Sequence, residues 1–257
     1  MQPNPLHECF ESGRVALGWW LTMPSAIGAE IMAELDLDYA CIDRQHGLIG
    51  YSDSLALLAS LTAWSVTAVI RVPWNTPEHI GKALDAGAMG VIIPMVNSAS
   101  ACRAAVEAAL YPPLGRRSYG PTRAAIVEGP GYFNEANIAI IPMIETAEAL
   151  ADLDGILSVE NVTAIYVGPA DLAISMGFHP GSDDPEFLQA LDQIVARCNA
   201  HGVVPGIHAT SSTAGDRLER GFRMVTITSD LSALRTRLTE DVTSVRNGLV
   251  GETTSGH

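Results

Sequence analysis

The sequence predicts a single α/β domain, a (β/α)8 TIM barrel spanning residues 1–257. Apolar runs of strand length alternate with helix-like stretches in eight units, as in a closed parallel barrel. Polar residues also follow several of these runs directly, where a barrel gathers its functional groups. No Gly-rich dinucleotide fingerprint opens the chain, which disfavours an open doubly wound sheet.

The first half of the chain contains four predicted strands, each followed by a helix. The strands cover 15–21, a run ending at 42, a run ending at 71, and 90–94. Ser25 is a suitable N-cap for the first helix, which extends to about residue 35, and the second helix covers 52–63. Pro77 lies in the first turn of the third helix, where its missing N–H costs little. An alanine-rich helix covers 98–110.

The stretch 111–137 interrupts this rhythm, because it is rich in Pro, Gly and Arg and lacks apolar periodicity. Connections of this length are usually functional, so we interpret it as a loop or lid. Strands follow at 139–144, 163–167, 203–207 and 223–228. The helices of this half are expected at 146–157, up to 176, and at 184–200, 211–220 and 230–246. A polar, frayed tail is expected from about residue 247.

Composition indicates a large buried core and an acidic surface. Hydrophobic residues make up 47% of the chain, and 29 acidic against 15 basic residues give a net charge of -14. This charge disfavours nucleic acid and anionic membranes as partners. The four cysteines lack paired metal spacing and are interpreted as buried thiols, and no apolar run is long enough for a membrane helix. We therefore expect a cytoplasmic protein that acts on small molecules.

Two carboxylates, Glu145 and Asp171, follow neighbouring predicted strands. In a barrel they would lie on adjacent strand ends, and a pair of oxygen ligands suits Mg²⁺ or Mn²⁺. The alternative is that each only caps the helix that follows it. Asp171 also closes the turn Gly168-Pro169-Ala170, whose backbone N–H groups could bind an anion.

His46 and Arg71 are the candidate catalytic side chains. His46 follows the second strand with Asp43 three residues before it, and an aspartate can fix the tautomer of a histidine. Asp85 is a second candidate partner for His46, although an isolated histidine is more often structural. Arg71 ends an apolar strand and could clamp a carboxylate or carbonyl oxygen.

Other side chains in the same region carry weaker arguments. Lys82 is the only lysine and falls inside a predicted helix, so a Schiff-base mechanism is poorly supported. Arg116, Arg117 and Arg123 in the 111–137 stretch could meet a second anionic group. For Arg116 and Arg117 a solvated surface position is the preferred interpretation.

With these residues the chain resembles the HpcH/HpaI aldolase family of metal-dependent pyruvate aldolases, which includes 4-hydroxy-2-oxoheptanedioate aldolase. The resemblance extends from about residue 17 to 230 and rests on several motifs in one order. They are Ile42-Asp43-Arg44-Gln45-His46-Gly47, Arg71-Val72-Pro73-Trp74-Asn75, Leu84-Asp85-Ala86-Gly87-Ala88, Pro94-Met95-Val96-Asn97, Tyr111-Pro112-Pro113-Leu114-Gly115-Arg116-Arg117, Ile144-Glu145-Thr146 and Gly168-Pro169-Ala170-Asp171-Leu172.

The resemblance implies a barrel whose eighth helix is swapped between subunits of a hexamer, built as a trimer of dimers. It further implies a divalent ion (Mg²⁺, Mn²⁺ or Co²⁺) and a role for each matching residue. By this resemblance Glu145 and Asp171 bind the metal, Arg71 holds the pyruvate oxygens, and the backbone around Ala170 binds the carboxylate. His46, supported by Asp43 and Asp85, forms the acid/base unit. Arg123 contacts the aldehyde side of larger substrates.

Two positions depart from this pattern and one has no match. Many relatives carry Glu where this chain has Gln45, and Gln where it has Met143, which affects substrate preference more than the reaction class. His208 is not matched to a family position; it could contact substrate, but a structural histidine is the preferred interpretation.

The reaction expected from the resemblance is reversible cleavage of a 4-hydroxy-2-oxo acid to pyruvate, or a similar 2-oxo acid, and an aldehyde. Two alternatives stay open at this point. One is an acyl-CoA lyase of the citrate-lyase type, and the other is a non-catalytic protein that binds 2-oxo acids. A base candidate together with both carboxylates and Arg71 argues against the binder, because binding alone does not require a base. The absence of an evident basic patch for the CoA phosphates disfavours the lyase only weakly.

Overall fold

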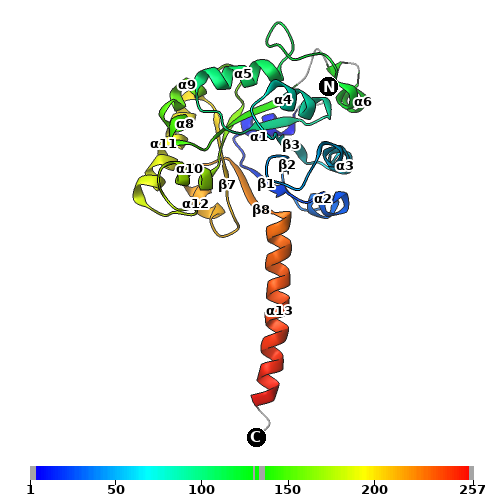
Figure 1. Cartoon of the computed structure of the whole chain (residues 1–257), viewed down its shortest axis with the longest axis vertical. Coiled ribbons are helices and arrows are strands. Elements are labelled where there is room, and N and C mark those ends of the chain that lie inside the picture. Colours follow the sequence, from blue (N-terminus) through cyan, green and yellow to red (C-terminus); the bar gives the residue numbers. More distant parts are fainter. Residues whose placement is uncertain (1–3, 130, 133–136, 255–257) are drawn as a thin grey trace.

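The computed structural model describes residues 4–129, 131–132 and 137–254, with side chains as far as residue 247. Its strands form one closed parallel barrel in sequence order, with β1 paired to β8, so the predicted (β/α)8 fold is confirmed. Figure 1 shows the helices arranged around this barrel. The strands are β1 Ala16–Leu21, β2 Tyr39–Asp43, β3 Thr67–Arg71, β4 Gly90–Ile93, β5 Ala139–Ile144, β6 Ala164–Val167, β7 Val204–His208 and β8 Met224–Ser229.

Side-chain caps begin several of the helices, and one of them is the predicted N-cap Ser25. Ser25 accepts a hydrogen bond from the Gly28 amide, and Thr76 accepts one from the His79 amide. The helices are α1 Pro5–Glu11, α2 Ala26–Ala33, α3 Tyr51–Leu61, α4 Pro77–Asp85, α5 Ala99–Ala109, α6 Thr122–Glu128, α8 Ala147–Ala151, α9 Leu153–Leu157, α10 Pro169–Ser175, α11 Pro185–His201, α12 Ala214–Glu219 and α13 Asp230–Thr254.

The strand residues alternate between two apolar layers. Tyr39 and Cys41 of β2 belong to the cluster inside the barrel, whereas Ala40 and Ile42 pack with the helices outside. Because side chains alternate along a strand, the residue after Ile42 faces inward again. This period of two directs the polar residues at the strand ends into the mouth of the barrel.

Several local predictions were wrong. Helix α1 was not expected; the side chain of Asn4 caps it, and its buried Leu6 extends the inner cluster. The 111–137 stretch contains the helix α6, and the helix expected at 146–157 divides into α8 and α9 at Asp152. There the Asp152 carboxylate accepts a hydrogen bond from the Ala99 amide at 2.7 Å.

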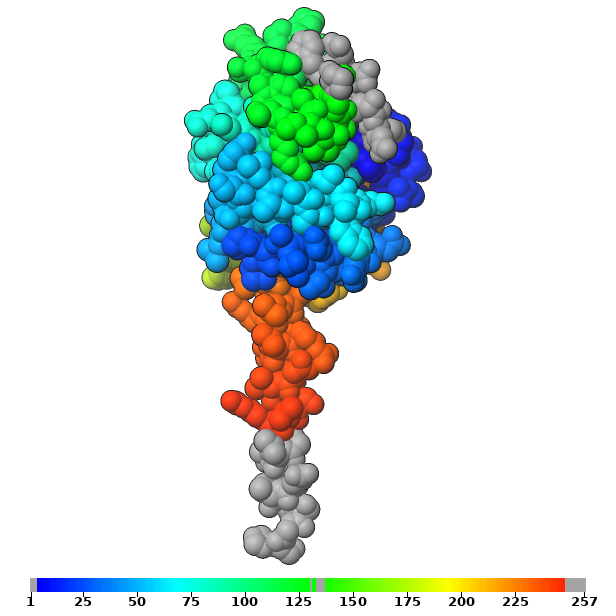
Figure 2. All heavy atoms as spheres, turned by 90° about the vertical axis from the view of Figure 1, so that its right-hand side faces the viewer, coloured from blue at the N-terminus to red at the C-terminus, as the bar shows by residue number. Residues whose placement is uncertain are grey.

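The last helix, α13, continues to Thr254 instead of ending near residue 246 as expected. Residues 255–257 of the predicted polar tail lie outside the described residues. Both views show α13 projecting away from the barrel (Figures 1 and 2). Its start is fixed by Asp230, whose carboxylate accepts hydrogen bonds from the amides of Thr22 and Met23 at 3.0 and 2.9 Å. No helix in the described ranges is long and apolar enough to cross a membrane.

Candidate active site

The carboxyl ends of the strands surround a cavity of about 210 Å³. Its polar lining comes from elements far apart in sequence, as expected for a barrel mouth. The lining residues are Trp20, His46, Arg71, Met143, Tyr166, Gly168, Pro169, Ala170, Asp171 and His208. The sequence therefore placed His46, Arg71 and the 168–171 turn correctly at one mouth.

Arg71 and Asp43 end neighbouring strands and lie opposite each other in the sheet register. The Arg71 Nε donates to Asp43 Oδ1 at 2.9 Å, and Nη2 donates to Oδ2 at 2.6 Å. Burial by itself raises the pKa of Asp43, but the hydrogen bonds and charge of Arg71 outweigh it, so the pKa lies below its ordinary value. Arg71 is thus a permanently charged group held in one orientation, with its guanidinium 5.1 Å from the centre of the Trp20 ring.

Glu145 is buried directly after β5, and Asp171 lies in the first turn of α10. The Glu145 Oε1 accepts a hydrogen bond from the Met95 amide at 2.6 Å. Met95 adopts a positive φ of 56°, an unusual conformation for a residue other than glycine, and this turn aims its N–H at the carboxylate. Burial raises the pKa of Glu145, and the nearby charge of Asp171 raises it further.

This carboxylate pair fits a divalent cation. The raised pKa of Glu145 shows that its charge is disfavoured beside a second carboxylate, and a positive ion between the two groups would stabilise it. Gly168 leaves room for one, since a Cβ at that position would lie 3.0 Å from Glu145 Oε2. Within the described part of the chain, no group of three or more His, Cys, Asp or Glu side chains is placed to hold a metal ion. The pair would therefore leave the other coordination positions to water and substrate, as Mg²⁺ commonly requires.

His46 lies at the rim of the cavity and is exposed. Its link to Asp43 differs from the expected one, because Asp43 accepts a hydrogen bond from the backbone amide of His46 at 3.2 Å and directs its carboxylate to Arg71. Asp43 therefore positions Arg71 and the backbone of the His46 loop, and the predicted pairing of its carboxylate with the imidazole ring was wrong.

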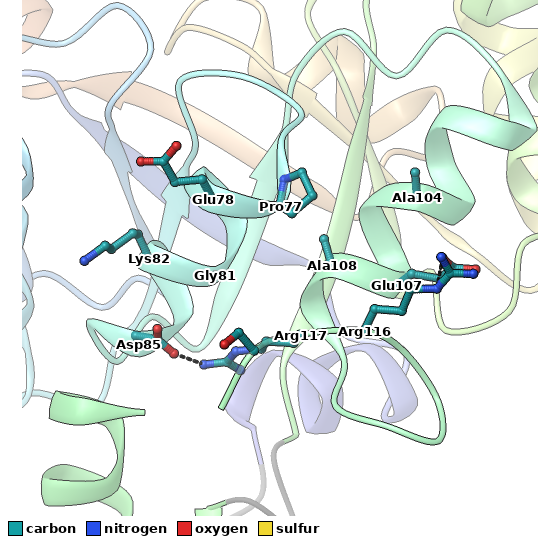
Figure 3. Close-up of a pocket in the computed structure, with 11 residues that line it drawn as sticks. Pro77, Glu78, Gly81, Lys82, Asp85, Ala104, Glu107, Ala108, Arg116 and Arg117 are labelled. Atoms are coloured by element: carbon teal, nitrogen blue, oxygen red, sulfur yellow. Dashed lines mark hydrogen bonds and ion pairs between the residues drawn. The ribbon is translucent and has the colours of Figure 1, made fainter. Parts of the chain in front are cut away.

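Asp85 and Arg123 lie away from this mouth in the same chain. Asp85 is the last residue of α4, a helix that returns from the carboxyl end of β3 to the start of β4. It pairs with Arg117 at 2.7 Å beside a separate cavity of about 580 Å³ between α4 and α5 (Figure 3). Arg123 donates to the Ala86 carbonyl oxygen at 2.8 Å, at the same end. Within one subunit the fold therefore does not bring Asp85 to His46 or Arg123 to the cavity, and the roles expected for both residues stay predictions.

Arg117 also corrects an expectation, because it is buried rather than solvated. Its guanidinium donates to the Tyr132 hydroxyl at 3.1 Å and lies 4.6 Å from the centre of the Tyr111 ring. Arg116 is exposed and pairs with Glu107, as expected for a surface residue.

Sequence matches identify the group of proteins to which this site belongs. A family model described as HpcH/HpaI aldolase/citrate lyase matches residues 16–236. The chain belongs to this family. A hydroxypyruvate/pyruvate aldolase of Rhizorhabdus wittichii is 37% identical over 236 residues, covering 90% of this chain and 94% of that protein. A 4-hydroxy-2-oxo-heptane-1,7-dioate aldolase of Salmonella dublin is 33% identical, covering 90% of each.

A solved structure supports the same assignment. The crystal structure of an HpcH/HpaI aldolase/citrate lyase family protein from Burkholderia cenocepacia J2315 superposes with a TM-score of 0.89 at 30% identity. The match covers 95% of this chain and 99% of that one. The predicted family is confirmed, and the chain is an enzyme of the HpcH/HpaI aldolase family.

Sequence reasoning missed some residues that shape the site of this HpcH/HpaI member. Trp20 and Tyr166 line the cavity with stacked rings 5.4 Å apart, and the Met95 amide holds Glu145. The period of two along β1 could have identified Trp20, because it shares a face with Ala16 of the inner cluster. No sequence pattern pointed to the backbone amide of Met95.

Both departures from the family pattern also lie in this region. Met143 is buried and lines the cavity with an apolar side chain. The backbone N–H of Gln45 donates a hydrogen bond to Asp43 Oδ1 at 3.0 Å. Gln45 therefore helps to fix the carboxylate that orients Arg71.

Proposed function

We propose that this enzyme reversibly cleaves 4-hydroxy-2-oxo acids to pyruvate, or a related 2-oxo acid, and an aldehyde. The observation that carries the proposal is that one cavity holds the Arg71 guanidinium, the Asp171 carboxylate and the His46 imidazole, with Glu145 beside it. This set provides charge stabilisation and proton transfer, the two requirements of aldol cleavage.

The 2-oxo acid would bind across the cavity. Its carboxylate would meet the backbone of the turn Gly168-Pro169-Ala170 and Asp171, and its keto oxygen would face Arg71. A divalent ion (Mg²⁺, Mn²⁺ or Co²⁺) bound by Glu145 and Asp171 would supply Lewis-acid polarisation of the 2-oxo group. Two negative carboxylates would otherwise repel the anionic substrate, which is why the proposal requires the cation.

Arg71 would stabilise the charge that develops on the keto oxygen as the C3–C4 bond breaks. Asp43 accepts one N–H from Nε and one from Nη2, so the two N–H groups of Nη1 and the second one of Nη2 are left for substrate. Because the ion pair fixes the orientation of Arg71 before substrate arrives, little reorganisation accompanies the reaction.

His46 would take the proton from the 4-hydroxyl group in cleavage and return it in synthesis. Its place at the exposed rim suits the aldehyde end of the substrate, which must leave toward solvent. A positioned acid/base group of this kind contributes about 10² to 10⁴ in rate.

We further propose a homo-oligomer, a hexamer built as a trimer of dimers, in which α13 is exchanged between subunits. A regular barrel packs its eighth helix against the first, but here α13 projects and α2 leaves Ile27 and Ile31 exposed by 66% and 61%. Helix α13 in turn carries exposed Leu234 and Leu238. Two unpartnered apolar stripes suit an exchange between copies. A cytoplasmic location remains a prediction.

The same assembly would give Asp85 and Arg123 a role in catalysis. Each lies at the end of the barrel opposite the mouth of its own chain, so either residue can act only at the site of a neighbouring subunit. The proposed acid/base support from Asp85 and aldehyde contact from Arg123 therefore depend on the oligomer.

Release of pyruvate from a panel of 4-hydroxy-2-oxo acids, with added divalent ion, tests the proposed reaction. We expect time-dependent release that is proportional to enzyme concentration and is accompanied by equimolar aldehyde. Binding of 2-oxo acids without release would indicate a non-catalytic binder, and cleavage confined to acyl-CoA substrates would indicate a citrate-lyase-type enzyme. Either result would contradict the proposal.

A further inference from the structure

His208, the last residue of β7, is a half-buried side chain of the cavity to which the proposed reaction gives no role. It continues the inward-facing series of Val204 and Gly206, so its ring points into the mouth of the barrel. Its plane stands at 89° to the indole of Trp20, with ring centroids 5.1 Å apart. This edge contact fixes the imidazole against the cavity wall.

The imidazole of His208 is uncharged at neutral pH. Burial lowers its pKa to about 4, and the positive charge of Arg71 contributes in the same direction. A neutral imidazole presents one hydrogen-bond donor and one acceptor. Its low pKa makes it a weak base, because general-base catalysis favours a pKa near the working pH. Its chemistry therefore suits hydrogen bonding to a neutral group rather than proton abstraction from carbon.

The polar groups directly beneath the cavity are already paired with each other. The Thr226 hydroxyl lies 2.9 Å from the Tyr39 hydroxyl and 2.5 Å from the Tyr166 hydroxyl. This network provides hydrogen-bond partners for both tyrosine hydroxyl groups within the core. On the Trp20 side of the cavity the lining is otherwise aromatic, so His208 is the side chain there that offers polar atoms to a ligand.

Trp20 connects this histidine to the reacting part of the site. Arg71 lies over the Trp20 ring, with its guanidinium carbon 5.1 Å from the ring centre, and His208 meets the edge of the same ring. Arg71, Ala170, Trp20 and His208 line this one cavity. In the proposed binding mode the keto oxygen would face Arg71 and the carboxylate would meet the turn at Ala170, so C3 would face the remaining lining side chains, Trp20 and His208. The substituent on C3 is thus the part of the substrate within reach of the imidazole.

We infer that His208 is a specificity residue that binds a hydroxyl group on C3 of the 2-oxo acid, so that the nucleophile class includes 3-hydroxy-2-oxo acids. This inference rests on the proposed aldol reaction. A hydroxyl group can both donate to and accept from the imidazole, whereas the methyl group of pyruvate leaves those polar atoms unpaired. A site built to bond a hydroxyl discriminates against an analogue that lacks it.

The test compares three nucleophiles in aldol synthesis with one aldehyde: hydroxypyruvate, pyruvate and 2-oxobutanoate. The last carries a methyl group where hydroxypyruvate carries the hydroxyl, so it matches the size without the hydrogen bond. For the wild-type enzyme we expect kcat/KM for hydroxypyruvate to exceed that for 2-oxobutanoate by about tenfold or more. A preference for 2-oxobutanoate would overturn the inference, and this comparison requires no variant.

His208→Leu should lower the hydroxypyruvate-to-pyruvate ratio of kcat/KM by about tenfold, and His208→Asn, which keeps a donor and an acceptor, should restore most of it. Circular dichroism and thermal melting establish that both variants are folded. If folded His208→Leu kept the wild-type ratio of kcat/KM values, His208 would have no role in specificity, whereas the proposed aldol reaction would be unaffected. A wild-type enzyme that joins none of the three nucleophiles to an aldehyde would contradict the proposed function itself.

Discussion

Arg71 and Asp43 form a buried two-point ion pair across adjacent strands, with Nε–Oδ1 and Nη2–Oδ2 distances of 2.9 and 2.6 Å. The pair places a fixed positive charge at the base of the mouth, beside a carboxylate pair suited to a cation. Water cannot solvate either charge fully, because the side chains of Arg71 and Asp43 are only 10% and 3% exposed. Orientation of Arg71 and stability of the barrel mouth are consequently linked.

Asp43→Asn should therefore lower the free energy of unfolding and alter its pH dependence. Removing one partner of a buried pair costs about 3–5 kcal/mol. The folded-state pKa of Asp43 is lowered, so its stabilisation is present above the ordinary pKa of about 3.9. It is lost as pH falls through the lowered value. Urea unfolding between pH 7 and about pH 3 should give a shallower acid decline in the variant; the same slope in both proteins would contradict the pairing.

Arg71→Ala should reduce kcat strongly, because the guanidinium is proposed to bind charge that grows in the transition state. Arg71→Lys should recover little, since an ammonium group cannot both pair with Asp43 at two points and face the substrate. Steady-state kinetics with a 4-hydroxy-2-oxo acid measure kcat and KM separately. If only KM rose, Arg71 would be a uniform binding group without a catalytic role.

His46→Ala should slow cleavage by about 10² to 10⁴ while metal and pyruvate still bind. His201→Ala is a matched control, because His201 lies on α11 and contacts Asp154 at 3.2 Å. Metal titration with and without pyruvate, together with cleavage rates, separates the roles. If the variant cleaved substrate at the wild-type rate, His46 would not be the base. If the variant lost its affinity for the metal, His46 would be a metal ligand instead.

Leu234→Asp with Leu238→Asp should reduce the oligomeric state, because both leucines lie on the exposed apolar surface of α13. Burying two carboxylates in an apolar contact is costly unless they are paired. Thr239→Asp, on the same helix, controls for added charge. Light scattering after size-exclusion chromatography measures the mass; an unchanged oligomer in the double variant would show that α13 is not the exchanged element.

The sequence predicted the barrel because strand and helix periodicities alternate along the chain and each segment agrees with the global pattern. It also placed Arg71 and His46 correctly, since residues that follow parallel strands must share one mouth. The Arg71–Asp43 pair could not be predicted, because it depends on the register between β2 and β3. The position of Asp85 could have been predicted, as a helix following a strand ends at the opposite face of the barrel.

The direction of α13 depends on tertiary contacts of Asp230 with Thr22 and Met23, which are distant in sequence. The orientation of Glu145 depends on the unusual backbone at Met95. The neutral state of His208 follows from burial beside Arg71. Each of these features arises from the environment that the fold creates rather than from a local pattern.

The central claim is that Glu145 and Asp171 hold a divalent ion on which aldol cleavage depends, and metal removal with add-back tests it most directly. Pyruvate release should disappear in excess chelator and return when Mg²⁺, Mn²⁺ or Co²⁺ is supplied in excess. Glu145→Ala should match the chelated wild type and should not recover with added ion, while Glu148→Ala, on the exposed side of α8, should respond like the wild type. Full activity in chelator, or borohydride trapping of substrate on Lys82, would contradict the account.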